Sequence, residues 1–158
     1  MKLENVCRSK TVKFFIGIMA AIVIAQFFFT IGINVTDSIP KRVFLIVKGT
    51  TPEVGDYVAF RFQGSRYYKK GRTFIKVIAG NEGDFLEIKD RCFLLNKKLL
   101  GCAKEKDREG RPVEPFAFTD IIPRDKIFVL GISKDSYDSR YFGFVDKNQV
   151  IGRANALF

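Results

Sequence analysis

Two residues of this sequence, Ser38 and Lys76, have surroundings that suit proton-transfer chemistry. Ser38 lies in a short polar stretch, residues 36–40, that closely follows a long apolar run. Lys76 occurs in an alternating apolar run, where Phe74 and Ile78 share its face of the expected strand. Because desolvation disfavours the ammonium form, such a lysine has a lowered pKa. It can then act as the general base that activates a serine hydroxyl.

The sequence contains no histidine. This excludes Ser-His-Asp and Cys-His catalysis, and it excludes zinc enzymes of the histidine-rich kind. Any proton transfer near neutral pH must therefore use a carboxylate or a lysine. We expect neither a metal ion nor another cofactor.

Each of these features also has a structural explanation. The hydroxyls and the proline of residues 36–40 can cap a helix and turn the chain into a strand. Lys76 can extend its amine to solvent from a strand edge. A third polar stretch, residues 131–143, can be a turn carrying an exposed pair of Asp138 and Arg140, which would contribute little to stability.

Residues 14–33 are predicted to anchor the protein in a membrane. These 20 residues carry no charge, and this length matches the hydrocarbon thickness of a bilayer. Residues 1–13 have a net charge of +3, so they are expected to stay in the cytoplasm. A cleaved signal peptide is the alternative, but its apolar region would be shorter and a clear cleavage site is absent.

The remainder, residues 34–158, is predicted to be one small, mainly antiparallel β domain outside the cytoplasm. Its apolar runs are short, rich in Val, Ile and Phe, and separated by turn residues. No helix longer than two turns is expected there, and the charged residues 103–115 are expected to form a solvated loop. The expected strands are residues 42–48, 57–62, 73–79, 85–88, 92–95 and 126–131.

Three cysteines and a formal charge of +10 bear on the surroundings of the protein. In an oxidising compartment Cys92 and Cys102, ten positions apart, could form a disulfide, and two free thiols are the alternative. Cys7 would lie in the cytoplasm and remain free. The positive charge suits contact with the anionic headgroups of a lipid bilayer. Nucleic acid is not expected as a partner, because the sequence has no motif for binding it.

Taken together, three stretches resemble, in their order and spacing, the signal peptidase family of Ser-Lys dyad serine endopeptidases. Residues 36–40 (TDSIP) resemble the nucleophile box that follows the membrane anchor. Residues 76–84 (KVIAGNEGD) resemble the strand whose lysine runs into Gly-x-x-Gly-Asp, and residues 135–143 (DSYDSRYFG) resemble the third box. The resemblance implies a β domain of signal-peptidase type with one N-terminal transmembrane helix.

The resemblance also implies a role for each matching residue. Ser38 would be the nucleophile and Lys76 its general base. The oxyanion would be held by the Ser38 backbone N–H and the Thr36 hydroxyl. Because Ser38 lies about five residues beyond the apolar stretch, a link of at most ~17 Å would keep the active site close to the bilayer.

The third box would support this dyad. Ser136 falls where the family has a serine that hydrogen-bonds the lysine, and Asp138 and Arg140 fall where it has an ion pair. Two positions depart from the family: Ile39 replaces the usual methionine, and residues 131–134 (GISK) replace Gly-Asp-Asn of many housekeeping members.

The short chain, its single anchor and the lack of an extended second β domain resemble the conjugative-transfer (TraF-like) branch. The spacing of Asn34, Thr36, Ser38 and Pro40, followed by Phe44, resembles it too. Members of this branch mature pilin subunits, and one joins the ends of its pilin into a ring. The implied partner is a membrane-inserted precursor, a conjugative prepilin, at the periplasmic face of a bacterial inner membrane.

Two other functions remain open from the sequence. One is a housekeeping type I signal peptidase with broad substrates. The other is a non-catalytic membrane-anchored component of a secretion or conjugation machine. Phe60, Phe62 and Phe74 either extend the contact with a substrate or belong to the core. The anchor argues against a related repressor-cleaving protease.

Overall fold

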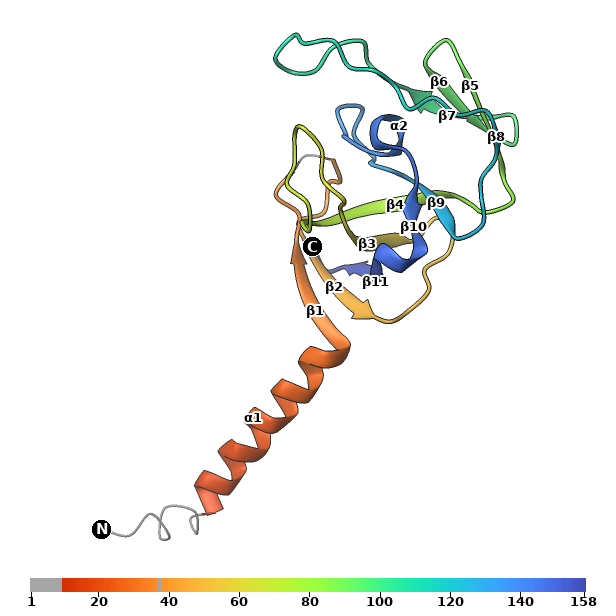
Figure 1. The fold of residues 1–158 in the computed structure, drawn as a ribbon. Coiled ribbons are helices and arrows are strands. Elements are labelled where there is room, and N and C mark those ends of the chain that lie inside the picture. The colour runs from red at the N-terminus through yellow and green to blue at the C-terminus, as the bar shows by residue number, and fades with distance from the viewer. Residues whose placement is uncertain (1–9, 37) are drawn as a thin grey trace.

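A computed structural model describes residues 10–36 and 38–158. A single long helix, α1 (Lys10–Phe28), projects from a β domain that contains the other elements (Figure 1). The helix has 19 residues, none of them buried, and is long and apolar enough to cross a membrane. At 1.5 Å per residue it would span about 28 Å of hydrocarbon. Residues 1–9 of the predicted cytoplasmic tail, with Cys7, lie outside the described residues, as does Asp37.

The apolar stretch 14–33 is divided between a helix and a strand. Helix α1 ends at Phe28, and the chain continues as β1 (Phe29–Ile33), which pairs antiparallel with β2 (Val43–Lys48). Gly32 packs closely here: a Cβ atom at this position would lie 2.8 Å from the terminal methyl carbon of Ile46, so a larger residue would displace that side chain. Ser38 thus lies ten residues beyond the helix, whereas the sequence analysis expected five residues beyond the membrane segment.

Seven antiparallel strands form the larger sheet of the described residues, in the order β1-β2-β11-β3-β4-β9-β10. Its further strands are β3 (Tyr57–Arg61), β4 (Thr73–Asn81), β9 (Lys126–Leu130), β10 (Val145–Asp146) and β11 (Val150–Ala156). Among the described residues of the β domain the helices are short: α2 (Ser139–Phe142) and the 3-10 helix η2 (Lys147–Gln149). The sheet confirms the predicted mainly antiparallel β fold and the absence of a longer helix in residues 38–158.

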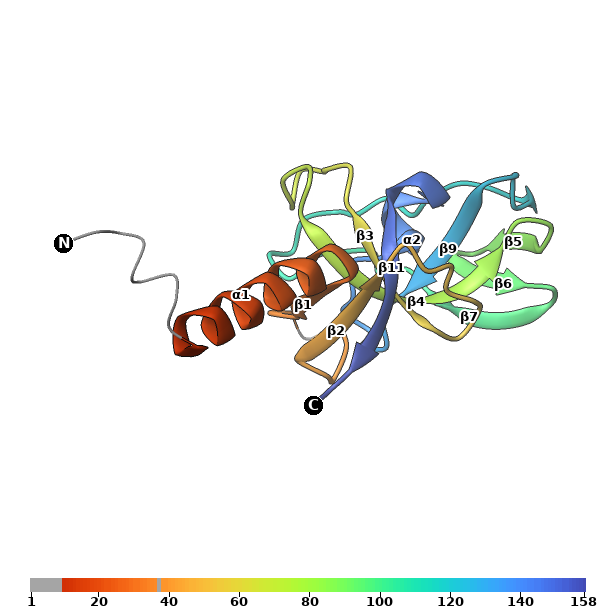
Figure 2. The same cartoon turned by 90° about the horizontal axis from the view of Figure 1, so that it is seen from below.

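The smaller sheet of the described residues has four antiparallel strands in the order β7-β6-β5-β8. They are β5 (Phe85–Lys89), β6 (Cys92–Leu95), β7 (Lys98–Cys102) and β8 (Asp120–Ile121). Cys92 and Cys102 face each other across β6 and β7 and form a disulfide. Residues 104–113, here called the charged lobe, leave the end of β7 and extend away from the smaller sheet, toward the loop between β3 and β4 (Figures 1 and 2).

Apolar side chains are buried on both faces of the larger sheet. One core cluster contains Phe60, Phe62 and Ile78, and another contains Phe44 and Ile46. A third cluster packs the smaller sheet against β9 around Leu86, Phe93 and Phe128. Lys76 lies in β4 between these layers, so the strand that carries it is fixed from both sides.

Candidate active site

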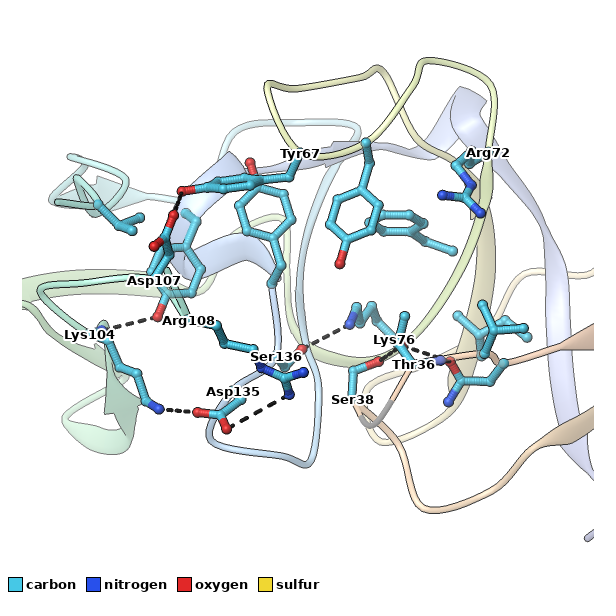
Figure 3. Close-up of a pocket in the computed structure, with 18 of the residues that line it drawn as sticks. Thr36, Ser38, Tyr67, Arg72, Lys76, Lys104, Asp107, Arg108, Asp135 and Ser136 are labelled. Carbon is cyan, nitrogen blue, oxygen red and sulfur yellow. Dashed lines mark hydrogen bonds and ion pairs between the residues drawn. The ribbon is translucent and has the colours of Figure 1, made fainter. Parts of the chain in front are cut away.

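A cavity of about 710 Å³ brings together residues that are far apart in the sequence (Figure 3). Ser38, Lys76 and Ser136 all line it, together with Thr36. They come from the segment after β1, from β4 and from the loop between β9 and α2. The tertiary structure therefore places the predicted nucleophile, its predicted base, the predicted supporting residue Ser136 and the predicted oxyanion donor Thr36 around one groove.

Lys76 is buried, with 4% of its surface exposed. Phe74 and Ile78 belong to the core cluster on its own face, whereas Ile75 packs in the other cluster, as the alternation predicts. Burial lowers the pKa of Lys76 to about 8, mainly through desolvation; Asp138 raises this pKa and Arg140 lowers it. About a tenth of the amine is therefore neutral at pH 7, far more than for an exposed lysine.

The Lys76 amine has one hydrogen-bond partner among the described residues. Its Nζ donates to Ser136 Oγ at 2.8 Å. The Phe74 ring lies 5.9 Å from the same nitrogen. Ser136 itself is 2% exposed, so the bond is shielded from water and fixes the direction of the amine.

Ser38 is held at its carbonyl oxygen and hydrogen-bonded at its hydroxyl. The carbonyl oxygen accepts from the backbone N–H groups of Ile132 (2.8 Å) and Ser133 (3.1 Å). Its Oγ lies 2.7 Å from Thr36 Oγ1. The Thr36 hydroxyl donates its single proton to Asn34 Oδ1 at 2.9 Å, so Ser38 is the donor toward Thr36.

Ser38 and Lys76 are neighbours in the groove without a hydrogen bond between them in the structure of residues 10–36 and 38–158. The serine hydroxyl points to Thr36 and the amine to Ser136 (Figure 3). A rotation about χ1 of Ser38 would redirect its hydroxyl away from Thr36. Catalytic hydrogen bonds are often long in unliganded enzymes and tighten when substrate binds.

Gly131 lies between the segment of Ser38 and the side chain of Ser136. A Cβ atom at this position would lie 2.0 Å from Ser136 Oγ and 2.9 Å from the carbonyl oxygen of Ser38. Its backbone N–H donates to Asp138 Oδ2 at 3.0 Å. The sequence indicates this glycine only as a loop boundary. Its close contact with the segments of Ser38 and Ser136 depends on the tertiary structure.

Asp138 and Arg140 form a buried ion pair, so the alternative of an exposed surface pair is wrong. The Asp138 side chain is fully buried, and 7% of the Arg140 side chain is exposed. The guanidinium donates from Nε at 2.9 Å and from Nη2 at 2.8 Å to the two carboxylate oxygens. Arg140 Nη1 also donates to the carbonyl oxygen of Cys102, which connects this pair to the strand that bears the disulfide.

The charged lobe forms a second wall of the groove, which sequence reasoning missed. Residues 103–115 were predicted to be only a solvated loop, yet several of them line the cavity beside Tyr67. Asp107 accepts from the Tyr67 hydroxyl at 3.0 Å and from Arg111 Nε at 2.8 Å. The high density of charged residues is the sequence signal that marks this segment. The position of the segment across the groove depends on the tertiary structure.

The three phenylalanines for which the sequence left two roles open occupy different environments. Phe60 and Phe62 are buried in the core, at 0% and 4% exposure. Phe74 is half-buried, packs against that core and also lines the groove. Of the three, only Phe74 is therefore positioned to contact a substrate.

Comparison with known proteins identifies relatives in the predicted family. The family "Signal peptidase, peptidase S26" matches residues 7–158. A signal peptidase I of Bacillus caldolyticus is 28% identical over 135 residues, covering 78% of this chain and 74% of its own. A probable conjugal transfer protein TraF of Sinorhizobium fredii is 30% identical over 158 residues, covering 88% of this chain and 84% of its own.

Other relatives are longer than the matched region. A probable signal peptidase I of Synechocystis is 33% identical over 112 residues, which cover 68% of this chain but 48% of its own. Among solved structures, a signal peptidase I from Enterococcus faecalis aligns with 66% of this chain and 97% of its own, at 24% identity and a TM-score of 0.45. Since the family match extends over nearly the whole sequence, this chain belongs to the signal peptidase family, peptidase S26, with TraF-like conjugal transfer proteins among its relatives.

Proposed function

We propose that this protein is a membrane-anchored serine endopeptidase that cleaves a membrane-inserted precursor, a conjugative prepilin, using Ser38 and Lys76. The observation that carries the proposal is the buried Lys76 amine, whose pKa is lowered to about 8, in the same groove as Ser38. A lysine of this kind is the base that a chain without histidine needs. Membership of a peptidase family supports the reaction class.

The reaction would begin when the Ser38 hydroxyl turns from Thr36 toward neutral Lys76. As Ser38 Oγ attacks the peptide carbonyl carbon, its proton passes to Lys76 Nζ, and the amine becomes an ammonium. The ammonium returns that proton to the nitrogen of the leaving peptide as the C–N bond breaks. Ser136 would keep the amine directed during both transfers, because it already accepts its hydrogen bond.

The oxyanion of the tetrahedral intermediate needs donors in place before it forms. The Ser38 backbone N–H and the Thr36 hydroxyl are the proposed donors. In the resting arrangement the Thr36 proton is bonded to Asn34 Oδ1. Thr36 would therefore have to turn its hydroxyl from Asn34 to the oxyanion.

An extended peptide can lie along the open side of β4. Residues 73–77 pair with β3, but pairing with β9 begins only at Val77. Thr73–Lys76 also line the groove. A peptide that adds a strand here would gain main-chain hydrogen bonds and place a carbonyl beside the dyad.

The acyl-enzyme has two possible acceptors. Attack by water releases a free carboxylate, whereas attack by an amine of the substrate itself joins two ends of that substrate into a ring. The relationship to proteins described as conjugal transfer proteins TraF supports a dedicated pilin substrate. Similarity to signal peptidase I enzymes also favours a second candidate, a housekeeping enzyme with many substrates.

The proposed location is the bacterial inner membrane. Helix α1 would cross it once, with the basic N-terminus in the cytoplasm and the β domain in the periplasm. The disulfide between Cys92 and Cys102 supports an oxidising compartment for the β domain.

The proposal is tested by co-expression with the pilin precursor from the same conjugation system, followed by intact-mass measurement of the product. Cleavage that depends on Ser38 supports the proposal, and a product lighter than the hydrolysed form by one water identifies ring closure. If the precursor is untouched while many secreted precursors are processed, the housekeeping function is correct. If Ser38→Ala changes no processing event in the host, the chain is a non-catalytic component.

Activity should rise with pH and level off above about pH 8. Protonated Lys76 cannot accept the Ser38 proton, and its pKa is lowered to about 8. Below that value kcat/KM should fall about tenfold per pH unit, because the neutral fraction falls tenfold. Initial rates on a quenched fluorescent peptide between pH 5 and pH 10 provide the measurement. A rate independent of pH, with chemistry rate-limiting, would rule out Lys76 as the base.

A further inference from the structure

The segment that comprises β3, the following loop and β4, the strand that carries Lys76, is strongly basic. Residues 57–81 contain six lysines and arginines and no carboxylate. Four of these cations lie in the loop 62–72, between β3 and β4: Arg66, Lys69, Lys70 and Arg72. Arg66 donates to Tyr67 Oη and to the carbonyl oxygen of Pro112, so it fastens this loop to the charged lobe.

The other three cations of the loop, Lys69, Lys70 and Arg72, are exposed. Within residues 10–36 and 38–158 their side chains form neither a hydrogen bond nor an ion pair. Arg72 lines the groove and directly precedes β4. The edge of the groove next to the catalytic strand therefore carries positive charge that the described residues do not neutralise.

The acidic side chains on the opposite wall do not balance this charge. Among the described lining residues the carboxylates are Asp107, Glu109 and Asp135. Arg111 pairs with both Asp107 and Glu109, and Lys104 pairs with Asp135. Each carboxylate thus has a cation within its own wall, and the field in the groove is positive toward Arg72.

We propose that the groove selects a precursor with an acidic side chain about four residues from the scissile bond, an inference that rests on the proposed peptidase function. Arg72 directly precedes β4 and lies four residues before Lys76, or about 13 Å at the rise of a strand. A substrate strand beside β4 has the same rise per residue. Its side chain opposite Arg72 therefore lies about four positions from the carbonyl held at the dyad.

Lipid headgroups are the other anionic partner that such a loop could meet. In Figure 1 the loop 62–72 lies beyond the end of β1 that is remote from α1. In the view of Figure 3, Lys76 lies between Arg72 and the pair formed by Lys104 and Asp135. Both views favour a role for Arg72 in the groove over contact with the bilayer.

The test uses the detergent-solubilised full chain and quenched peptides derived from the pilin precursor. Each peptide carries Glu, Gln or Lys at one position, scanned from five residues before the scissile bond to five after it. We expect one position, about four residues from the bond, where Glu lowers KM about fivefold relative to Gln with kcat unchanged. Arg72→Gln should remove this preference, and Arg72→Glu should transfer it to the Lys peptide.

Two controls make the result specific. Lys134→Gln removes an exposed lysine that does not line the groove, and it should leave the preference intact. In 1 M salt, where the Debye length is about 3 Å, the preference should shrink in the wild type. Affinity of the same peptides for Ser38→Ala, measured by fluorescence anisotropy, should show the same charge preference without turnover.

Three outcomes would overturn the inference. Ser38-dependent cleavage with equal KM for Glu and Gln peptides at every position would leave the peptidase function standing but refute the charge selection. Equal binding of the peptides to Ser38→Ala would refute it even if no peptide were cleaved. If Arg72→Gln instead weakens binding to phosphatidylglycerol vesicles and leaves peptide selectivity unchanged, the loop contacts the membrane.

Discussion

Replacing Lys76 with methionine is expected to lower precursor cleavage by about 10⁴-fold while the β domain stays folded. Methionine fills a similar volume but offers no proton acceptor of useful basicity. Folding should be at least as favourable, because below pH 8 the buried ammonium costs the folded state up to about 3 kcal/mol, judged from the lowering of the pKa from 10.5 to about 8. Quenched-peptide kinetics and thermal unfolding measure the two effects separately.

Lys76→Arg sharpens this experiment. Arginine retains the positive charge and can donate to Ser136, but its guanidinium does not lose its proton in proteins. It should therefore be as inactive as Lys76→Met and Ser38→Ala. Lys134→Met, on the loop that carries Ser136, should keep its activity. Normal turnover by Lys76→Met would show that another group removes the Ser38 proton.

Asp138→Asn is expected to cost about 3–5 kcal/mol of folding free energy, which lowers the melting temperature by roughly 10 °C. The Asn side chain would fill the same space but leave the buried Arg140 guanidinium without its counter-charge. The amide nitrogen would also face guanidinium N–H groups that now donate to the carboxylate. Urea unfolding of the purified full chain measures this loss of folding free energy.

The same substitution should shift the pH profile in a defined direction. Asp138 raises the pKa of Lys76 by its charge, so its removal should move the midpoint of activity below about pH 8. Asp135→Asn is the matched control for stability, because its pair with Lys104 is exposed to solvent and should contribute little to the free energy of unfolding. Equal destabilisation by both variants would show that the Asp138–Arg140 pair is not a special support.

The sequence predicted those elements whose local pattern of apolar residues is regular. Alternation of apolar residues predicted β4 and the face of Lys76, since a strand places every second side chain on one side. It also predicted β2, β3, β5, β6 and β9. Strands β1, β7, β8, β10 and β11 were not predicted. Strand β1 continues the apolar run of α1 without a turn signal, and β11 contains Gly152, beside a register shift in its pairing with β3. Strands β8 and β10 have only two residues each, too few to show an alternating pattern.

The absence of histidine and the order of three motifs were enough to indicate the reaction class, because chemistry restricts which residue types can transfer a proton at neutral pH. Only the tertiary structure decided that the Asp138–Arg140 pair is buried and that Gly131 lies against both Ser136 and Ser38. Only it placed the charged lobe across the groove. These features depend on contacts between residues distant in the chain, and burial, which fixes the pKa of Lys76, is a property of packing that no single segment contains.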